Sequence, residues 1–484
     1  MSIDNILDFL KPPPPPVPVP ASAPPHWKHQ LQTIERGLEN PRFLDFSDPG
    51  TGKTRAHVDI FRARLERNET TKLLVLAPKT LLEAAWADDI RAYQPDLKVS
   101  VAWAANREEA FEEDADVFIT NVDAVKWLAK QNKRWWSKRF ARNPTLVIDE
   151  LTAYKTFSGT QRSEAAKQIK DYFTFRTGMT ATPTPNSVTE LWNQLYIIDD
   201  GERLGSRYFK FRSAVCDPVQ TGPRPEHRIW VDKDGIEEAV AMLHADITIR
   251  HIFEECMDIP PNFSKMVRFD LPPKLYQQYL EMEATSILKL QDRDIVGIHA
   301  GVVRNKLLQI ISGAVYNSPG DEQRYTLLDD SRYELVSDLV AQTKHSVVFY
   351  NWEHQKHETV KYLKKRGIEY AVIDKTVSDK GRNEIRRAYQ RGDFQTLLLH
   401  PQTGAHGLTL TKGTSTIWSS PVYQSDFLKQ GKHRIYRGGQ TKRTYTRMVS
   451  ARDTVDEDVY LKVGRKAKRM ATFLELLEER RARR

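Results

Sequence analysis

The stretch RFLDFSDPGTGKT, residues 42–54, decides the fold of the first half of the chain. Its apolar beginning reads as a buried strand, and the sequence that follows it, RAHVDIFRARLER, has a helical pattern. Between them, Gly50 and Gly52 allow backbone N–H groups to turn inward around phosphate oxygens. A strand, a glycine-rich turn and a helix in this order predict a phosphate-binding loop.

The side chains of this loop suit a nucleotide with its metal ion. Lys53 is expected to reach the β and γ phosphates, and Thr54 to offer a hydroxyl to Mg²⁺ at the positive end of the helix. Ser47 stands where the strict motif has its first glycine, a position at which small residues suffice. The residues expected to line the nucleotide are Ser47, Pro49, Gly50, Thr51, Gly52, Lys53 and Thr54.

A second stretch, TLVIDE (145–150), ends in two acidic residues and complements the loop. It is an apolar strand that ends in Asp149 and Glu150, and ligands of open α/β sheets sit at the carboxyl ends of the strands. Asp149 is expected to hold Mg²⁺ through water, whereas Glu150 is expected to orient and deprotonate the attacking water. An Asp-Glu pair after a strand would by itself more often belong to a solvated turn, but the upstream loop favours a catalytic role for this pair.

Apolar strands alternate with helical patterns in two parts of the chain, which predicts a parallel α/β sheet in each part. Helical patterns dominate residues 235–340, and the tail after residue 451 reads as amphipathic helix. The strands expected in the first part are 42–47, 72–78, 115–121, 145–150 and 175–182, and those in the second part are 346–352, 369–374, 396–401, 414–420 and 445–450.

Length and composition limit the class of protein. The chain has 484 residues, enough for two or three domains, and a net charge of +9 that favours an anionic partner such as nucleic acid. It has no apolar run of about 18 residues and no secretory signal, so no membrane association is expected. Cys216 and Cys256 lack metal-ligand spacing and are expected to be ordinary thiols in a reducing compartment.

The N-terminus reads as an extension of the folded part. Residues 11–25 are rich in proline, which excludes helix and sheet and predicts an extended tether. Residues 1–10 include the short amphipathic stretch IDNILDFL, either a frayed terminus or a peptide that docks a protein partner.

A basic stretch near the other end, QGKHRIYRGGQ (430–440), is a candidate phosphate ligand. Its charges could contact the backbone of a nucleic acid or the terminal phosphate of a bound nucleotide, with Lys432 and His433 as ordinary surface charge.

Together these motifs resemble the superfamily 2 helicase-type ATPases, and more narrowly the Swi/Snf-type DNA translocases in the compact form common in bacteriophages. The resemblance runs in order from about residue 25 to residue 464. WKHQ (27–30) is similar to the glutamine motif of the family, which implies that Gln30 hydrogen-bonds adenine. In the basic stretch the family pattern falls on Gln430, Arg434, Arg437 and Gln440, which implies γ-phosphate contacts by the two arginines.

Other stretches resemble the motifs that contact DNA or couple it to the nucleotide. LAPKTLLEAAW (76–86) and ITNVDAV (119–125) are similar to DNA-side motifs, and TGMTATPTPNSVTELW (177–192) to the motif that links the two sites. LLLHPQTGAHGLTL (397–410) resembles motif V, whose glycines allow close approach of nucleotide or DNA. The implied DNA contacts are Lys79, Thr80, Thr120, Asn121, Gln402 and Thr403, the coupling residues are Thr180 and Thr182, and the further nucleotide contacts are Gly407 and Gln430.

The chain departs from the family pattern at two places. Leu151 and Thr152 follow Asp149 and Glu150 where the family has Ala-His, so the contact from this box to the coupling motif would have to come from Thr152. His400 and Pro401 replace a Ser-Thr pair of motif V, and proline has no N–H or hydroxyl to offer a phosphate; that contact would move to Gln402 or Thr403.

The resemblance implies an α/β fold of two RecA-like parallel-sheet lobes in tandem, with helical insertions and a C-terminal helical segment. It implies an ATP hydrolase that uses Mg²⁺ and moves along DNA without reading its sequence, in the cytoplasm, or in that of a bacterial host if the chain is phage-encoded. The expected regions are a tail (1–25), lobe 1 (26–200), a connecting helical region (201–340), lobe 2 (341–450) and C-terminal helices (451–484).

Three alternatives stay open at this stage. One is a helicase that separates strands of RNA or of DNA, and another is a non-catalytic nucleic-acid-binding assembly factor on an ATPase scaffold. The third is the motor of a nuclease assembly, although no metal-dependent nuclease motif is evident in the sequence.

Overall fold

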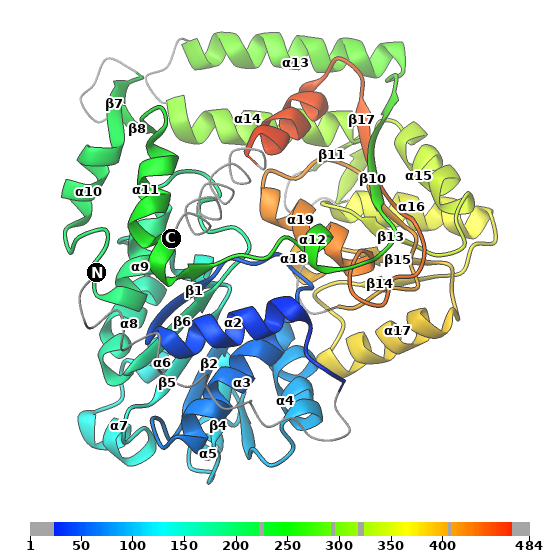
Figure 1. Ribbon diagram of the computed structural model, residues 1–484. Coiled ribbons are helices and arrows are strands. Elements are labelled where there is room, and N and C mark those ends of the chain that lie inside the picture. Colours follow the sequence, from blue (N-terminus) through cyan, green and yellow to red (C-terminus); the bar gives the residue numbers. More distant parts are fainter. Residues whose placement is uncertain (1–23, 222–226, 292–295, 318–323, 405–407, 467–484) are drawn as a thin grey trace. The chain divides into compact units, whose positions relative to one another are not determined.

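The computed structural model describes residues 24–221, 227–291, 296–317, 324–404 and 408–466. They form two compact units, and each unit contains one large parallel sheet (Figure 1). The first unit comprises the described residues up to Ala181 together with Trp192–Ser206 and His244–Ile252, and the second comprises Thr182–Leu191, Arg207–Leu243 and the described residues from Phe253 on.

The sheet of the first unit has seven strands in the order β3-β4-β2-β5-β6-β1-β9, and every neighbouring pair is parallel. All residues of β2 and β5 are buried, as the continuous apolar runs in the sequence predict for strands covered on both faces. The strands are β1 (Arg42–Asp45), β2 (Leu73–Ala77), β3 (Val99–Ala102), β4 (Val117–Asn121), β5 (Thr145–Asp149), β6 (Phe175–Met179) and β9 (Thr248–Ile249).

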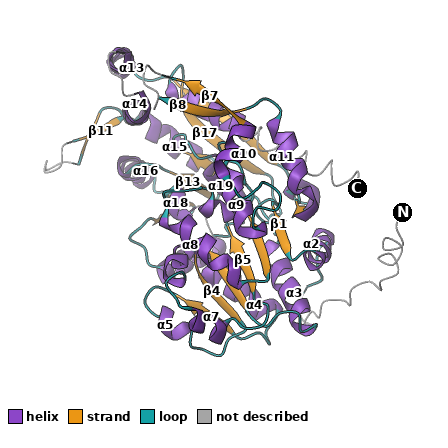
Figure 2. Cartoon of the chain, turned by 90° about the vertical axis from the view of Figure 1, so that its left-hand side faces the viewer, coloured by secondary structure: helices purple, strands orange, loops and turns teal. Residues whose placement is uncertain are grey.

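Helices lie on both faces of this sheet (Figure 2). One face packs on α3 and on the run from Leu82 to Ile90, where Phe61, Trp86 and Ile90 share a core with strand residues such as Val75 and Val147. The helices are α2 (Lys28–Glu39), α3 (Lys53–Glu66), α4 (Asp88–Tyr93), α5 (Arg107–Ala110), α6 (Val125–Leu128), α7 (Lys133–Arg139), α8 (Gln161–Ile169) and α9 (Glu190–Asp199), whose first two residues belong to the second unit.

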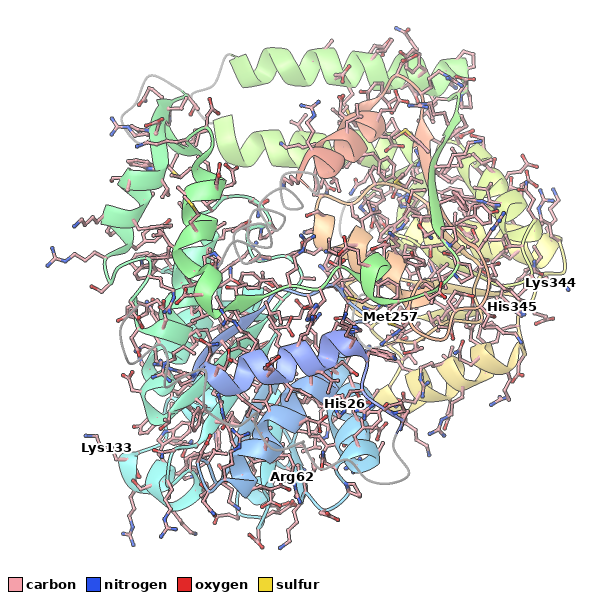
Figure 3. All side chains as sticks on the ribbon, viewed as in Figure 1. His26, Arg62, Lys133, Met257, Lys344 and His345 are labelled. Atoms are coloured by element: carbon pink, nitrogen blue, oxygen red, sulfur yellow. The ribbon has the colours of Figure 1, made fainter. Side chains whose placement is uncertain are left out.

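The segment ahead of α2 is fixed to α3. His26, labelled in Figure 3, lies with Nε2 2.6 Å from Oδ2 of Asp59, and Nε2 of Gln94 donates to Oδ1 of the same carboxylate at 2.7 Å. Both sides of the Asp59 carboxylate are therefore used inside the first unit, and α2 is held beside the helix that follows the glycine-rich loop.

The sheet of the second unit has six strands in the order β10-β17-β16-β13-β15-β14, again with every pair parallel. Five of them match strands expected from the sequence, and β10 was not predicted. The strands are β10 (Asn262–Phe269), β13 (Ser346–Phe349), β14 (Tyr370–Ile373), β15 (Thr396–Leu399), β16 (Ser415–Trp418) and β17 (Thr444–Ala451). The expected fold class, two parallel α/β lobes in tandem, is confirmed.

The second unit also contains helices and two hairpins, which lie before and between the strands of this sheet in the sequence. The hairpins are β7 (Cys216–Gln220) with β8 (Arg228–Asp232) and β11 (Ala314–Tyr316) with β12 (Tyr325–Leu327). The helices are α10 (Tyr208–Val215), α11 (Ile236–His244), α12 (Phe253–Cys256), α13 (Pro273–Gln291), α14 (Val296–Ile311), α15 (Ser331–Ala341), α16 (Glu353–Lys365), α17 (Asp379–Arg391), α18 (Pro401–Gly404), α19 (Ser425–Ile435) and a last helix over residues 455–466.

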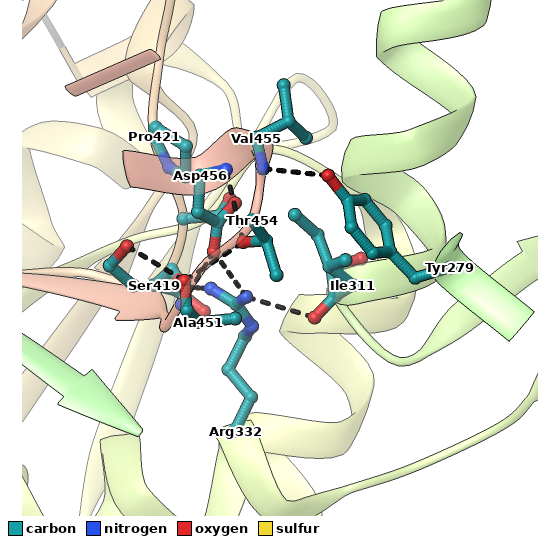
Figure 4. A network of polar contacts seen from close by, with 12 residues as sticks. Tyr279, Ile311, Arg332, Ser419, Pro421, Ala451, Thr454, Val455 and Asp456 are labelled. Atoms are coloured by element: carbon teal, nitrogen blue, oxygen red, sulfur yellow. Dashed lines mark hydrogen bonds and ion pairs between the residues drawn. The ribbon is translucent and has the colours of Figure 1, made fainter. Parts of the chain in front are cut away.

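A buried arginine ties several elements of the second unit together (Figure 4). The guanidinium of Arg332 donates to the backbone oxygens of Ser419 and Ile311 and lies 2.5 Å from Oδ2 of Asp456. The same carboxylate oxygen accepts the backbone N–H of Ala451. The network joins α14, α15, the end of β16 and the last helix, and because both charges are almost fully buried, removing either one would leave the other unpaired.

Several expectations fall outside these elements. The N-terminal tail up to residue 23 and the tail from residue 467 lie outside the described residues. Cys216 and Cys256 are free thiols, as expected. In the part of the chain that the structure describes, no helix has both the length and the hydropathy needed to cross a membrane.

Candidate nucleotide-binding site

The glycine-rich loop lies between β1 and α3, where the sequence placed it. Gly50 and Gly52 have φ of 88° and 75°, in the left-handed region that glycine adopts without strain. The backbone conformation therefore favours glycine at position 52, and a Cβ there, 2.4 Å from Nε2 of Gln30, would also displace the Gln30 amide.

Lys53 points back into the loop. Its ammonium donates to the backbone oxygens of Ser47, at 2.7 Å, and Asp48, at 2.9 Å. The hydroxyl of Thr51 donates to Asp48 as well, so the loop is closed by its own side chains. This geometry places a positive charge in the glycine-rich turn at the amino end of α3, and the amino end of a helix is a site that favours a phosphate group.

The start of the loop is anchored by a buried carboxylate. Asp45, at the end of β1, accepts the backbone N–H of Ser47 at 2.9 Å and pairs with Nε2 of His57 on α3 at 3.0 Å. Burial acts to raise the pKa of Asp45, but the hydrogen bonds from His57 and Ser47 and the charge of Lys53 hold this pKa well below its ordinary value. The anchor is therefore ionised, and it fixes the loop to both flanking elements.

Gln30, which the family resemblance assigns to adenine, is buried beside the loop. Its Oε1 accepts the backbone N–H of Trp27 at 2.9 Å, and its Nε2 donates to the backbone oxygen of Gly52 at 3.1 Å. His29 adds a contact from Nε2 to the backbone oxygen of Thr51 at 2.8 Å. Helix α2 thus braces the loop, and the adenine contact of Gln30 stays a prediction.

Ser47 contributes more than small size. Its hydroxyl accepts the backbone N–H of His251 at 3.0 Å, and the backbone N–H of Asp48 donates to the oxygen of His251 at 3.0 Å. Thr33 on α2 lies 3.0 Å from Nε2 of the same histidine. Sequence reasoning missed His251, because a contact between residues 204 positions apart leaves no local signal.

Ser47→Gly, which restores the strict loop motif, is expected to destabilise the protein. The backbone N–H of His251 would lose its buried acceptor, at a cost of about 1–3 kcal/mol. We expect a lower midpoint of thermal unfolding by calorimetry for Ser47→Gly and Ser47→Ala, and no shift for Ser137→Ala on the exposed side of α7. An unchanged midpoint in both Ser47 variants would show that the hydroxyl contributes nothing.

Asp149 and Glu150 lie at the carboxyl end of β5. Because β5, β6 and β1 are parallel neighbours, this end is at the same edge of the sheet as the loop that follows β1. Oδ2 of Asp149 accepts the indole N–H of Trp86 at 2.9 Å. Burial raises the pKa of Asp149, while this hydrogen bond and the charge of Lys53 act in the opposite direction. Glu150 has φ and ψ of 60°, a left-handed conformation that is strained for glutamate and recurs at functional sites.

Thr180 is the coupling residue that reaches the acidic pair. Its hydroxyl lies 3.5 Å from Oε2 of Glu150, the outer limit of a hydrogen bond, and its backbone N–H donates to Asp45. The contact from the acidic box to the coupling motif was expected from Thr152, but the side chain of Thr152 hydrogen-bonds to none of the described residues. Glu150 makes this contact instead, to Thr180. Thr182, the second expected coupling residue, is buried.

The loop and the acidic pair fit a magnesium ion of the kind that is held mainly by phosphates. Thr54, in the first turn of α3, is half-buried and its hydroxyl makes no hydrogen bond to the described residues, and Asp149 supplies a carboxylate at the same edge. Hydroxyl and carboxylate oxygens are the ligands that Mg²⁺ prefers beside phosphate. The described residues hold no cluster of three or more His, Cys, Asp or Glu side chains suited to a metal.

The residues expected on the DNA side differ in accessibility. Lys79 is exposed, and the hydroxyl of Thr80 is buried without a hydrogen-bond partner among the described residues. Asn121 is half-buried and accepts from Arg107 at 3.3 Å. Thr120 is fully buried and its hydroxyl donates to the backbone oxygen of Ala102 at 2.8 Å, which holds β4 to β3; a DNA contact by Thr120 stays a prediction.

In the second unit the basic stretch forms the end of α19 and the turn after it. Arg434 is 7% exposed, and its guanidinium donates to the backbone oxygens of Gln430 and Leu408. Arg437 is half-buried beyond the helix end. Nε2 of Gln440 lies 3.0 Å from each of three backbone oxygens, which fixes the turn that carries Arg437.

Of the two neighbouring residues that the sequence suggested as surface charge, His433 is buried, whereas Lys432 forms an exposed ion pair. His433 is buried, and its ring packs edge-on against Phe253 at a centroid distance of 5.2 Å. Lys432 is half-buried, and its Nζ lies 3.1 Å from Oε1 of Glu254, which follows Phe253 in α12. Both residues hold α19 against α12 inside the second unit.

Motif V is only partly described. Pro401 begins the short helix α18, Gln402 is exposed with its backbone N–H on Nδ1 of His400 at 3.3 Å, and Thr403 lies in the same helix. Gly407, an expected nucleotide contact, lies outside the described residues. Gln430, the other one, is buried on α19.

The fold and this site define a phosphate-loop α/β protein with two parallel-sheet units. Residues 44–318, more than half of the chain, match the model of the SNF2-related domain, and residues 331–439 match the helicase conserved C-terminal domain. The chain belongs to the SNF2-related family, and it carries the two domains of SNF2-type helicase-like ATPases.

Similar proteins include a phage protein, a bacterial helicase and a solved ATPase core. Protein p41 of Acyrthosiphon pisum secondary endosymbiont phage 1 is 26% identical over 449 residues, which cover 89% of this chain and 94% of that protein. An uncharacterized ATP-dependent helicase of Mycoplasma pneumoniae is 22% identical over 442 residues, or 88% of this chain but only 39% of the helicase. The solved SWI2/SNF2 ATPase core of Sulfolobus solfataricus in complex with dsDNA is 20% identical, with 90% of each chain covered and a TM-score of 0.43.

Proposed function

We propose that this chain is an ATP-dependent DNA translocase that couples ATP hydrolysis to movement along double-stranded or branched DNA. The observation that carries the proposal is the set of Lys53, Asp149 and Glu150 at one edge of the first sheet, with Lys53 inside a glycine-rich loop. Membership of the SNF2-related family supports ATP as the nucleotide. Its similarity to a phage protein supports a role in replication, recombination or repair of phage-type DNA.

The first unit supplies the groups for phosphate binding and water activation. Lys53 and the N–H groups of the loop bind the β and γ phosphates, and Thr54 and Asp149 hold Mg²⁺. When bound, the metal ion neutralises charge that develops on the phosphate oxygens. Glu150, held in its strained backbone conformation and near Thr180, orients the attacking water and accepts its proton.

The second unit supplies positive charge for the γ-phosphate. In this proposal Arg437 stabilises the charge of the transition state and Arg434 positions the turn that carries it. The helix α19 is braced by α12, and Gln440 fixes the turn from the other side, so Arg437 is presented on a rigid support.

DNA is the proposed partner because the chain has a net charge of +9 and an exposed Lys79 in the first DNA-side motif. Contacts to phosphate rather than to base edges make movement independent of sequence. Lys79, Thr80, Asn121, Gln402 and Thr403 are the proposed contacts. A protein partner for residues 1–10 also remains a proposal.

One experiment tests the proposed function. ATP hydrolysis is measured with duplex DNA, forked DNA, four-way junctions, single-stranded DNA and RNA, beside displacement of a third strand from a triplex. We expect the strongest stimulation by duplex or branched DNA, and triplex displacement that requires hydrolysable ATP and is absent in Lys53→Ala. Stimulation by RNA alone, or no hydrolysis with any nucleic acid, would contradict the proposal and favour an RNA helicase or a non-catalytic assembly factor.

A further inference from the structure

Trp86 contacts the acidic pair although no catalytic motif assigns it a role. Its indole N–H donates to Oδ2 of Asp149 at 2.9 Å, and the indole is fully buried. An indole N–H is a donor only, so it cannot serve as a metal ligand in competition with the carboxylate. This hydrogen bond can fix the rotation of the Asp149 carboxylate, so that Oδ1, the oxygen that does not face the indole, also has a defined direction.

The place of Trp86 in the chain connects this carboxylate to the expected DNA side. A 3-10 turn, Lys79–Leu81, follows β2 and continues into a π-helical turn, Leu82–Ala87, and then into α4. The strand β2 neighbours β5, which ends in Asp149. Lys79 and Thr80 thus lie at the beginning of the helical run that carries Trp86.

The π-helical turn sets the direction of the indole. π-helical turns are rare, and they occur often at functional sites, because the widened turn has poorer packing than an α-helix and persists only where something holds it. Here Leu82, Trp86 and Ala87 are all buried in the core that covers one face of the sheet. The indole is therefore packed in the same core as the π-helical turn that carries it, and its N–H is directed at Asp149.

We propose that Trp86 is a positioning residue that orients Asp149 for Mg²⁺ and transmits DNA contact at Lys79 and Thr80 to the metal site. The inference rests on the proposed function, because it takes Asp149 as the metal-holding carboxylate. A contact with DNA would shift the 3-10 turn, the π-helical turn would follow, and the indole would change its hold on Asp149. Magnesium affinity thereby becomes dependent on DNA.

Trp136 offers a matched control in the same unit. It is fully buried like Trp86 and stacks on Tyr172 with ring centroids 4.4 Å apart, but its indole N–H has no hydrogen-bond partner among the described residues. Trp86→Phe and Trp136→Phe therefore remove the same ring atoms from a packed core, and only the first removes a hydrogen bond.

The test measures binding of a fluorescent ATP analogue by the full chain in EDTA, in Mg²⁺, and in Mg²⁺ with duplex DNA. Because loss of a group that orients a metal ligand lowers metal affinity by about 10–100-fold, we expect Trp86→Phe to need about 10-fold more Mg²⁺ for tight binding. Its binding in EDTA should equal that of the wild type, and duplex DNA should no longer lower its Mg²⁺ requirement. Trp136→Phe should match the wild type in all three conditions.

The outcomes separate this inference from the proposed function. An unchanged Mg²⁺ requirement in Trp86→Phe, or the same increase in Trp136→Phe, would overturn the role of Trp86. Wild-type protein that gains no affinity from Mg²⁺ would overturn the proposed function and the inference with it. If Trp86→Phe does not fold, 3-benzothienylalanine at position 86, which keeps the ring shape and replaces N–H by sulfur, provides the same comparison.

Discussion

Lys53→Ala is expected to reduce ATP hydrolysis by about 10³-fold, at the upper end of the loss from removing one preorganised donor to a transition-state charge. The ammonium lies inside the loop, on the backbone oxygens of Ser47 and Asp48, at the point where a γ-phosphate would be bound. DNA affinity, measured by fluorescence anisotropy, should stay close to that of the wild type.

Lys72→Ala is the matched control for this variant. Lys72 also donates to a backbone oxygen, that of Ala115 at 2.6 Å, but it precedes β2 at the amino end of the strand. It lies at the opposite edge of the same sheet from the loop, because parallel strands all begin at one edge. Lys72→Ala should hydrolyse ATP normally. A similar loss in both lysine variants would mean that hydrolysis depends on general stability or charge rather than on the loop.

The sequence is sufficient for the parts of the fold that have local signals. The strands β2 and β5 are buried on both faces, so they are continuous apolar runs in the sequence. The loop between β1 and α3 has positive φ at two positions, and both are occupied by glycine. Buried strands and a glycine-rich loop are each defined by residues that are close together in the sequence, and for that reason they could be predicted.

Other features depend on contacts between distant residues. The strand β10 pairs with β17, whose first residue lies 182 positions further along the chain, and the half-exposed, mixed sequence of β10 gave no strand signal. The hydrogen bond from His251 to Ser47 spans 204 positions, so the reason for a serine in the loop was hidden. Patterning reveals which residues are buried, but it does not reveal which strands or loops they meet.

The site residues show the same limit in another form. The family pattern located Arg434, but it could not show that the guanidinium is bonded to Leu408 and Gln430. A run of charges suggested that His433 is on the surface, whereas Phe253 covers it. The family pattern assigned the hydroxyl of Thr120 to DNA, but it could not show that this hydroxyl donates to a neighbouring strand. Residue type and spacing indicate the chemistry available, and the partner of each polar atom decides whether it is used.

Arg437→Ala is expected to lower kcat by about 10³-fold or more while leaving DNA affinity and thermal stability nearly unchanged, because an arginine finger contributes about 10³–10⁵ to kcat. The side chain is half-buried beyond the end of α19, in a turn that Gln440 holds from the other side. Arg443→Ala removes an exposed arginine six positions further on and should leave all three quantities at the wild-type level.

Arg434→Ala should behave differently from Arg437→Ala, and the difference tests the division of roles between the two arginines. Arg434 is buried and donates to two backbone oxygens, so its removal deletes two buried hydrogen bonds and is expected to lower the unfolding midpoint as well as kcat. If Arg437→Ala instead loses DNA affinity and turnover to the same degree, the stretch binds nucleic-acid phosphate. If the two variants are equally unstable, the turn is structural and the γ-phosphate must be contacted by another cation.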